Sequence, residues 1–207
     1  MLLEAKQLTS VRGDRTLFSG LDLYVNSGEL WQIEGPNGAG KSSLLRILAG
    51  LLPAQHGHVY FSGELIENHL EQYYQHLLFI GHKAAVKPEL TAIENLEFYA
   101  AVQGVELHEP PYEILAKVGL VGLEDIPAQR LSAGQQRRIA LARLWLSNAK
   151  LWILDEPFTA LDVDGIALLH SRFAEHLLAG GAIILTSHQE LITPLYSVQA
   201  LQLRYQH

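Results

Sequence analysis

The stretch that decides the fold reads Gly35-Pro36-Asn37-Gly38-Ala39-Gly40-Lys41-Ser42, and Ser43 follows it directly. It joins an expected strand, residues 30–34, to an expected helix, residues 41–49. Glycines let backbone N–H groups curl around a phosphate, and the helix start directs further donors at the same charge. Lys41 is expected to reach the β- and γ-phosphates, and the Ser42 hydroxyl to ligate Mg²⁺. A chance glycine-rich turn is the alternative, but the strand-then-helix context favours a site for a nucleoside triphosphate.

A second stretch, Leu151-Trp152-Ile153-Leu154-Asp155-Glu156, reads as an apolar strand that ends in two acids. Ligands of open α/β folds bind at the carboxyl edge of the sheet, which is where these acids lie. Asp155 is expected to hold Mg²⁺ opposite Ser42, and Glu156 to act as general base on the attacking water. The alternative is a strand whose acidic end only caps the next turn. The glycine-rich loop upstream favours the catalytic interpretation.

Two weaker signals complete the set of candidate residues. Leu131-Ser132-Ala133-Gly134-Gln135 opens a helix, so Ser132 and the N–H groups beside Gly134 form another possible anion site. The chain's own loop already holds the phosphates, so this helix start suits the γ-phosphate of a nucleotide bound by another subunit. His188, after the expected strand 182–186, is predicted to contact the γ-phosphate. Separately, the helix start would be an ordinary serine cap and His188 a surface residue.

Strands and helices alternate along most of the chain, which favours a largely parallel sheet covered on both faces. Residues 2–33 read as short strands with turns at 13–14 and 27–29, and Leu21, Leu23 and Val25 alternate at strand period. Further strands are expected at 58–61, 77–80, 151–154 and 182–186. Helices are expected at 93–102, 112–118, 135–147 and 166–179. We predict one domain, with a nucleotide-binding core at 1–82 and 131–207 and a helical subdomain at about 83–130.

Composition limits the function further. The chain has 207 residues, 48% of them hydrophobic, which is enough for one α/β domain with a substantial core. A net charge of −7 argues against nucleic acid as a partner, and the absence of cysteine excludes disulfides and cysteine metal sites. The polar, acidic N-terminal segment does not read as a signal peptide, and no apolar run is long enough for a membrane span. Any membrane span is therefore expected to come from another chain.

Together these motifs resemble the ATP-binding cassette (ABC) superfamily over nearly the whole chain. Residues 35–42 resemble Walker A, 131–135 the signature motif, 151–156 Walker B, 157–162 (ending at Asp162) the D-loop, and His188 the switch histidine. The resemblance implies a mostly parallel sheet with an antiparallel β subdomain and a helical insertion. It also implies a head-to-tail homodimer that holds two ATP molecules, each between one subunit's P-loop and the other's signature motif. Hydrolysis by Glu156 then releases the interface.

Two positions depart from the superfamily pattern. Arg12 stands where an aromatic residue usually stacks on adenine, and a guanidinium can also stack on a base. His82 stands where the superfamily has a glutamine that senses Mg²⁺ and the γ-phosphate. His82 is therefore either a replacement metal contact or an ordinary loop histidine.

Within the superfamily, the chain is similar to the ATP-binding subunits of cytochrome c maturation, or haem-exporter, complexes. The similarity rests on Gly81-His82, on residues 90–96, 135–138 and 142–146, and on residues 151–162. It implies a peripheral subunit at the cytoplasmic face of a bacterial inner membrane, where it powers integral membrane partners in haem export or in release of a haem-loaded chaperone. The alternatives are a soluble ABC ATPase of iron–sulfur cofactor assembly and the ATPase of another small-molecule transporter. A DNA-repair or translation role is disfavoured because no basic face or second cassette is present.

Overall fold

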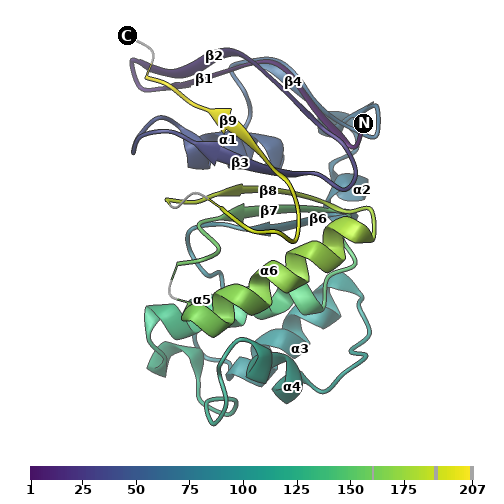
Figure 1. The fold of residues 1–207 in the computed structure, drawn as a ribbon, viewed down its shortest axis with the longest axis vertical. Coiled ribbons are helices and arrows are strands. Elements are labelled where there is room, and N and C mark those ends of the chain that lie inside the picture. The colour runs from purple at the N-terminus through teal and green to yellow at the C-terminus, as the bar shows by residue number, and fades with distance from the viewer. Residues whose placement is uncertain (160, 189–190, 206–207) are drawn as a thin grey trace.

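The computed structural model describes residues 1–159, 161–188 and 191–205, which form two sheets with helices between and below them (Figure 1). One sheet is antiparallel, with the order β2-β1-β4-β5, and the other is parallel, with the order β6-β7-β8-β3-β9. The antiparallel strands are β1 (Leu3–Arg12), β2 (Arg15–Val25), β4 (His56–Phe61) and β5 (Glu64–Leu65). The parallel strands are β3 (Leu30–Glu34), β6 (Leu77–Ile80), β7 (Leu151–Asp155), β8 (Ala182–Thr186) and β9 (Val198–Gln202). This architecture confirms the predicted α/β fold class.

The first hairpin turns at Gly13 and Asp14 as predicted, but its strands are longer than the short strands we expected. β1 and β2 contain 10 and 11 residues, and their ladder continues through several register shifts. Gln7 and Gly20, whose φ angles are 52° and 63°, lie at these irregularities. Polar residues inside a strand are therefore accommodated as bulges rather than as turns.

The parallel sheet is buried on both faces, which explains why β7 and β8 are apolar up to their last residues, Asp155 and Thr186. Every residue of β7 and β8 is buried. α1 (Lys41–Leu48) packs between this sheet and the antiparallel one, and α6 (Val163–Leu178) covers the opposite face (Figure 1). The edge strand β9 was not predicted, because it is only partly buried and carries Gln199 and Gln202 among its five residues.

A group of helices lies between β6 and β7 in the chain and at the end of the molecule away from the antiparallel sheet (Figure 1). It contains α3 (Ala92–Gln103), α4 (Pro111–Lys117) and α5 (Ala133–Ala142), which share an apolar core of their own. The remaining helical elements are α2 (Leu70–Gln75) and the 3₁₀ helices Ile66–Asn68, Ala128–Arg130 and Arg143–Trp145. Among the described residues, no helix combines the length and apolarity of a membrane span. The proposed subdomain limits, about residues 83 and 130, remain a prediction.

Side-chain caps move the starts of two helices upstream of the predicted positions. α5 begins at Ala133 rather than at residue 135, because Ser132 caps it. Its α-helical part ends at Ala142, and a 3₁₀ turn replaces the expected continuation to 147. α6 begins at Val163 rather than at residue 166, because Asp162 Oδ1 accepts a hydrogen bond from the Gly165 N–H at 2.9 Å.

The packing of α6 on the sheet includes a buried histidine. The His176 ring stacks on Trp152, with centroids 3.7 Å apart and an interplanar angle of 6°. His176 is 8% exposed, and this burial lowers its pKa from 6.5 to about 4. The folded protein therefore holds this imidazole neutral at a pH where the unfolded chain binds a proton.

This histidine predicts a loss of stability in mild acid. A depressed pKa contributes stability that is complete above about pH 6.5 and declines as the pH falls towards 4. Lowering the pH from 7 to 5 is expected to cost about 2 kcal/mol of unfolding free energy through His176. Urea titrations at both pH values measure it, with His176→Phe as the variant that keeps the stack. An equal acid loss in His176→Phe would contradict the assignment.

Candidate nucleotide-binding site

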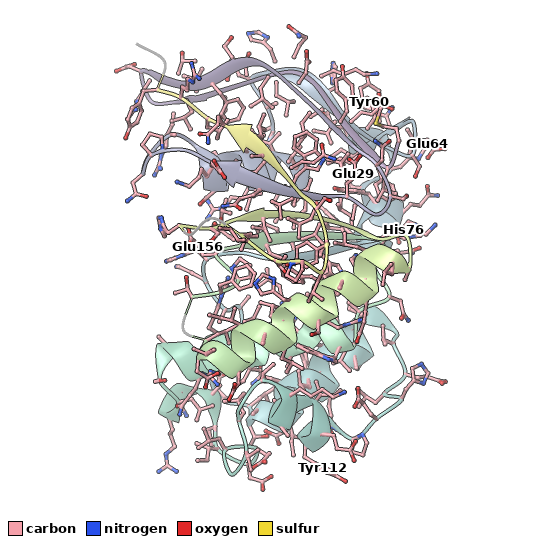
Figure 2. The ribbon with its side chains drawn as sticks, viewed as in Figure 1. Glu29, Tyr60, Glu64, His76, Tyr112 and Glu156 are labelled. Atoms are coloured by element: carbon pink, nitrogen blue, oxygen red, sulfur yellow. The ribbon has the colours of Figure 1, made fainter. Side chains whose placement is uncertain are left out.

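A cavity lies at the carboxyl edge of the parallel sheet, beside the loop that joins β3 to α1. Figure 2 places Glu156 at this edge and His76 at the opposite end of the sheet. The cavity is lined by Arg12, Leu17, Asn37, Gly38, Gly40, Lys41, Ser42, Ser43, His82, Asp155, Glu156 and His188. All of these except Leu17 were predicted from the sequence. Residues that are up to 176 positions apart in the chain therefore meet in one place.

The loop between β3 and α1 depends on glycine at two positions. Gly40 is the N-cap of α1 and has a φ of 99°, and a Cβ there would lie 3.0 Å from Leu17 Cβ. At Gly35 a Cβ would lie 2.5 Å from the Leu203 carbonyl oxygen, so only glycine fits beneath the chain segment after β9. No side chain caps α1 at Gly40, so its first N–H groups are open to an anion from outside the helix. Gly35, Pro36 and Ala39 shape this loop without lining the cavity.

Lys41 begins α1 and turns back over the loop. Its Nζ donates hydrogen bonds to the carbonyl oxygens of Gly35 at 2.6 Å and Pro36 at 3.3 Å. An ammonium group has three donors, so these bonds leave one for a further acceptor. The two carbonyl groups are neutral, and a phosphate oxygen would be the stronger partner.

Asp155, which ends β7, and Glu156, which follows it, are held by a threonine that sequence reasoning missed. Thr186, fully buried at the end of β8, donates from Oγ1 to Asp155 Oδ1 at 2.7 Å. Thr186 Oγ1 also accepts a hydrogen bond from the Glu156 N–H at 3.0 Å. Asp155 and Thr186 are register partners across β7 and β8. A hydroxyl residue at the end of the expected strand 182–186 was the sequence signal that could have identified Thr186.

Three other predicted residues line the same cavity as the acids. His188 Nε2 lies 3.2 Å from Glu156 Oε1, so the two predicted catalytic side chains are in direct contact. His82 and Arg12 line the cavity from the segments after β6 and at the end of β1. The structure therefore places His82 and Arg12 on the same cavity as the acids, and their roles toward Mg²⁺ and adenine stay predictions.

An aromatic residue near the loop was also missed. The Tyr205 hydroxyl donates to the Asn37 carbonyl oxygen at 2.6 Å, and the Arg15 guanidinium lies 4.8 Å from the centroid of its ring. Tyr205 follows β9, the strand that sequence reasoning did not find. Without that strand, nothing in the sequence places residue 205 beside residue 37.

The residues predicted to act on a partner's nucleotide do not line this cavity. Ser132 and Gln135 form a capping box in which each side chain accepts the other's backbone N–H, at 3.2 and 2.9 Å. Ser132 and Ala133 are exposed, and Gly134 and Gln135 are partly exposed, so this helix start faces outward. The signature residues are therefore available to a second molecule rather than to the chain's own cavity.

Asp162, the predicted D-loop residue, caps α6 and also contacts α5. Its Oδ2 lies 3.3 Å from the Arg138 guanidinium. The hydrogen bond from the Gly165 N–H, followed by the Arg138 bond, lowers the pKa of the Asp162 carboxyl group. Ala160, in the same predicted loop, lies outside the described residues. The observed role of Asp162 is to link α6 to α5.

This fold and this cavity define a P-loop nucleotide-binding protein. Residues 18–159 match the ABC transporter family. The chain is 57% identical to the cytochrome c biogenesis ATP-binding export protein CcmA of Idiomarina loihiensis, over 99% of this chain and 93% of the relative. It is 52% identical to the protein of the same name from Vibrio cholerae, over 92% of each chain. The chain belongs to the ABC transporter ATP-binding family, in the group of cytochrome c biogenesis ATP-binding export proteins.

Solved structures support the same fold. An ATP-binding subunit of an ABC transporter superposes with a TM-score of 0.80 at 28% identity, covering 91% of this chain and 80% of that one. The ATP-binding cassette MJ0796, in a dimeric post-hydrolysis state with ADP and Pi, superposes with a TM-score of 0.83 at 22% identity. That superposition covers 98% of this chain and 96% of the cassette, and it shows a shared fold.

Proposed function

We propose that this chain binds ATP in the cavity, hydrolyses it in a head-to-tail dimer, and powers a membrane complex of c-type cytochrome biogenesis. The observation that carries the proposal is the convergence of Lys41, Ser42, Asp155, Glu156 and His188 on one cavity beside the open start of α1. The relatives at 57% and 52% identity are named for cytochrome c biogenesis and export, which supports the cellular role.

In the proposed reaction, the triphosphate lies along residues 35–43. The N–H groups at the start of α1 and the Lys41 ammonium balance its charge. Glu156 accepts a proton from the water that attacks the γ-phosphorus, and the bond to the β,γ-bridging oxygen breaks to leave ADP and phosphate. His188, 3.2 Å from the Glu156 carboxylate, orients this base and faces the transferred phosphoryl group.

The cavity also suits Mg²⁺. Ser42 supplies a hydroxyl oxygen and Asp155 a carboxylate, and both line it. Mg²⁺ prefers oxygen donors and takes only one or two carboxylates from a protein when phosphates and water complete its shell. Ser42 and Asp155 would hold the ion, with His82 as a further candidate, and the ion would neutralise charge on the phosphates.

The exposed start of α5 supports the dimer. The N–H groups of Ser132 and Gln135 are bonded within the capping box, so Ala133 and Gly134 supply the helix N–H donors, away from the chain's own cavity. We place this surface on the γ-phosphate of the ATP held by a second copy. Each nucleotide then joins two chains, and hydrolysis weakens the contact.

Co-purification from membranes tests the cellular role. The affinity-tagged chain, extracted in mild detergent, is expected to bring down integral membrane proteins and to localise to the cytoplasmic face of the inner membrane. The untagged chain is the control for adventitious binding. If all of the protein is recovered in the aqueous fraction with no membrane protein attached, that result would instead favour a soluble ABC ATPase of cofactor assembly.

A further inference from the structure

Arg137 is a buried arginine in α5, five residues after the helix cap Ser132. It is 6% exposed. One amino group of its guanidinium donates to the Gly81 carbonyl oxygen, and the other donates to the carbonyl oxygens of Asp155 and, at 3.3 Å, Glu156. Burial is unfavourable for a charged group and lowers the pKa of this guanidinium, and the charges of Asp155 and Glu156 only partly offset that effect. A buried charge that binds only backbone carbonyl groups therefore calls for an explanation.

The three carbonyl groups belong to the catalytic edge of the sheet. Asp155 ends β7, Glu156 follows it, and Gly81 follows β6, the neighbouring strand. The planar fork of Arg137 reaches the two strand ends with two separate amino groups, whereas a lysine would have to reach both with one nitrogen. Gly81 also immediately precedes His82, which lines the cavity. Arg137 thus contacts the segments that present His82, Asp155 and Glu156, without lining the cavity itself.

The peptide that carries Glu156 requires such support. Glu156 has a φ of 56°, in the left-handed region that a residue with a Cβ rarely adopts. Such a conformation persists where the surroundings determine it from several sides. Here Thr186 accepts the Glu156 N–H, and Arg137 donates to the carbonyl oxygens of Glu156 and of the residue before it. Thr186 thus holds the N–H group of Glu156, and Arg137 holds its carbonyl group.

We propose that Arg137 is a positioning residue that couples α5, the helix that begins with the signature motif, to the Glu156 carboxylate. This inference rests on the proposed role of Glu156. Five residues of α5, about 7.5 Å of helix, separate Arg137 from the Ser132 start that would dock on the partner's ATP. When a second copy presses on that start, a displacement of α5 shifts the carbonyl groups that Arg137 holds. Binding of the second copy and the orientation of the Glu156 carboxylate are thereby linked through the Arg137 side chain.

The test compares Arg137→Lys and Arg137→Ala in the full chain, with any co-purifying membrane proteins retained. We expect kcat for ATP hydrolysis to fall about tenfold to a hundredfold in Arg137→Ala, since an ångström-scale misplacement of a catalytic group has effects of this size. Arg137→Lys should recover only part of the loss. KM for ATP should stay within about threefold, because Arg137 does not line the cavity.

Chemical rescue separates positioning from folding. On the order of 10 mM guanidinium, far below unfolding concentrations, should restore part of kcat in Arg137→Ala, while the same concentration of NaCl should not. Arg143→Ala is the matched control, because Arg143 is also buried, follows α5 directly and contacts Tyr99 rather than the site. It should keep a near-normal kcat and show no rescue.

Wild-type kcat in folded Arg137→Ala would overturn the inference, as would an equal loss in Arg143→Ala. A loss of kcat that guanidinium leaves unchanged would also count against positioning. Glu156→Gln separates a failure of the Arg137 inference from a failure of the proposed role of Glu156. If Glu156→Gln abolishes turnover while Arg137→Ala does not, only the Arg137 inference fails. If Glu156→Gln turns over normally, the proposed catalytic role fails first.

Discussion

Glu156→Gln is expected to lose ATP turnover by about a hundredfold or more while it keeps ATP binding, because a general base contributes that much to rate. The amide is close in size to the carboxylate but cannot accept the proton of the attacking water. Glu156 follows β7 at the cavity, with its N–H held by Thr186, so the substitution leaves the backbone contacts in place. ATP that is bound but not cleaved should also accumulate as a dimer. Phosphate release and light scattering with ATP measure the two effects.

The matched control is Glu175→Gln. Glu175 lies on α6, where its carboxylate pairs with Arg172 away from the cavity. Its turnover and its monomer–dimer distribution should equal those of the wild type. Full turnover in Glu156→Gln would remove Glu156 from the role of base, whatever the oligomeric state.

Lys41→Ala is expected to weaken ATP binding by about tenfold to a hundredfold. Hydrogen bonds to a charged partner contribute about 1.5–3 kcal/mol, which corresponds to that range of dissociation constants. The Lys41 ammonium donates hydrogen bonds to the carbonyl oxygens of Gly35 and Pro36 in the loop, where it can also bind a phosphate oxygen. Titration with a fluorescent ATP analogue gives the dissociation constant.

Lys87→Ala is the control for Lys41→Ala, because Lys87 packs over Phe98, outside the residues that line the cavity. It should bind the nucleotide as the wild type does. An unchanged affinity in Lys41→Ala, with correct folding confirmed by circular dichroism, would show that the loop does not hold the triphosphate as proposed.

Much of the cavity could be predicted because its chemistry is local in the chain. The loop of residues 35–43 carries its spacing, its glycines and its strand and helix within about twenty residues, and the apolar strand before Asp155 is equally compact. His188 and Arg12 were weaker predictions, since each is a single residue placed by its order relative to the motifs. The structure brings both to the cavity.

The missed residues depend on tertiary contacts that no short window contains. Thr186 matters because β8 lies beside β7 in register, and Tyr205 because β9 pairs with β3 and carries the chain back over the loop. β9 itself has too little apolar alternation to be recognised. In the sequence, Arg137 is one of two adjacent arginines in α5, and only its contacts with the strand ends distinguish it.

In the proposed dimer each ATP is bound by two chains, and mixing two defective variants tests whether the site is shared. In a Glu156→Gln background, Lys41→Ala lacks the lysine of the loop. Ala133→Glu adds a carboxylate that suits a helix start but repels a partner's phosphate. Each variant alone is expected to stay monomeric with ATP. Their mixture should form dimers, because the loop of one and the signature helix of the other rebuild one complete site. A mixture that remains monomeric, while Glu156→Gln alone dimerises, would contradict the shared site.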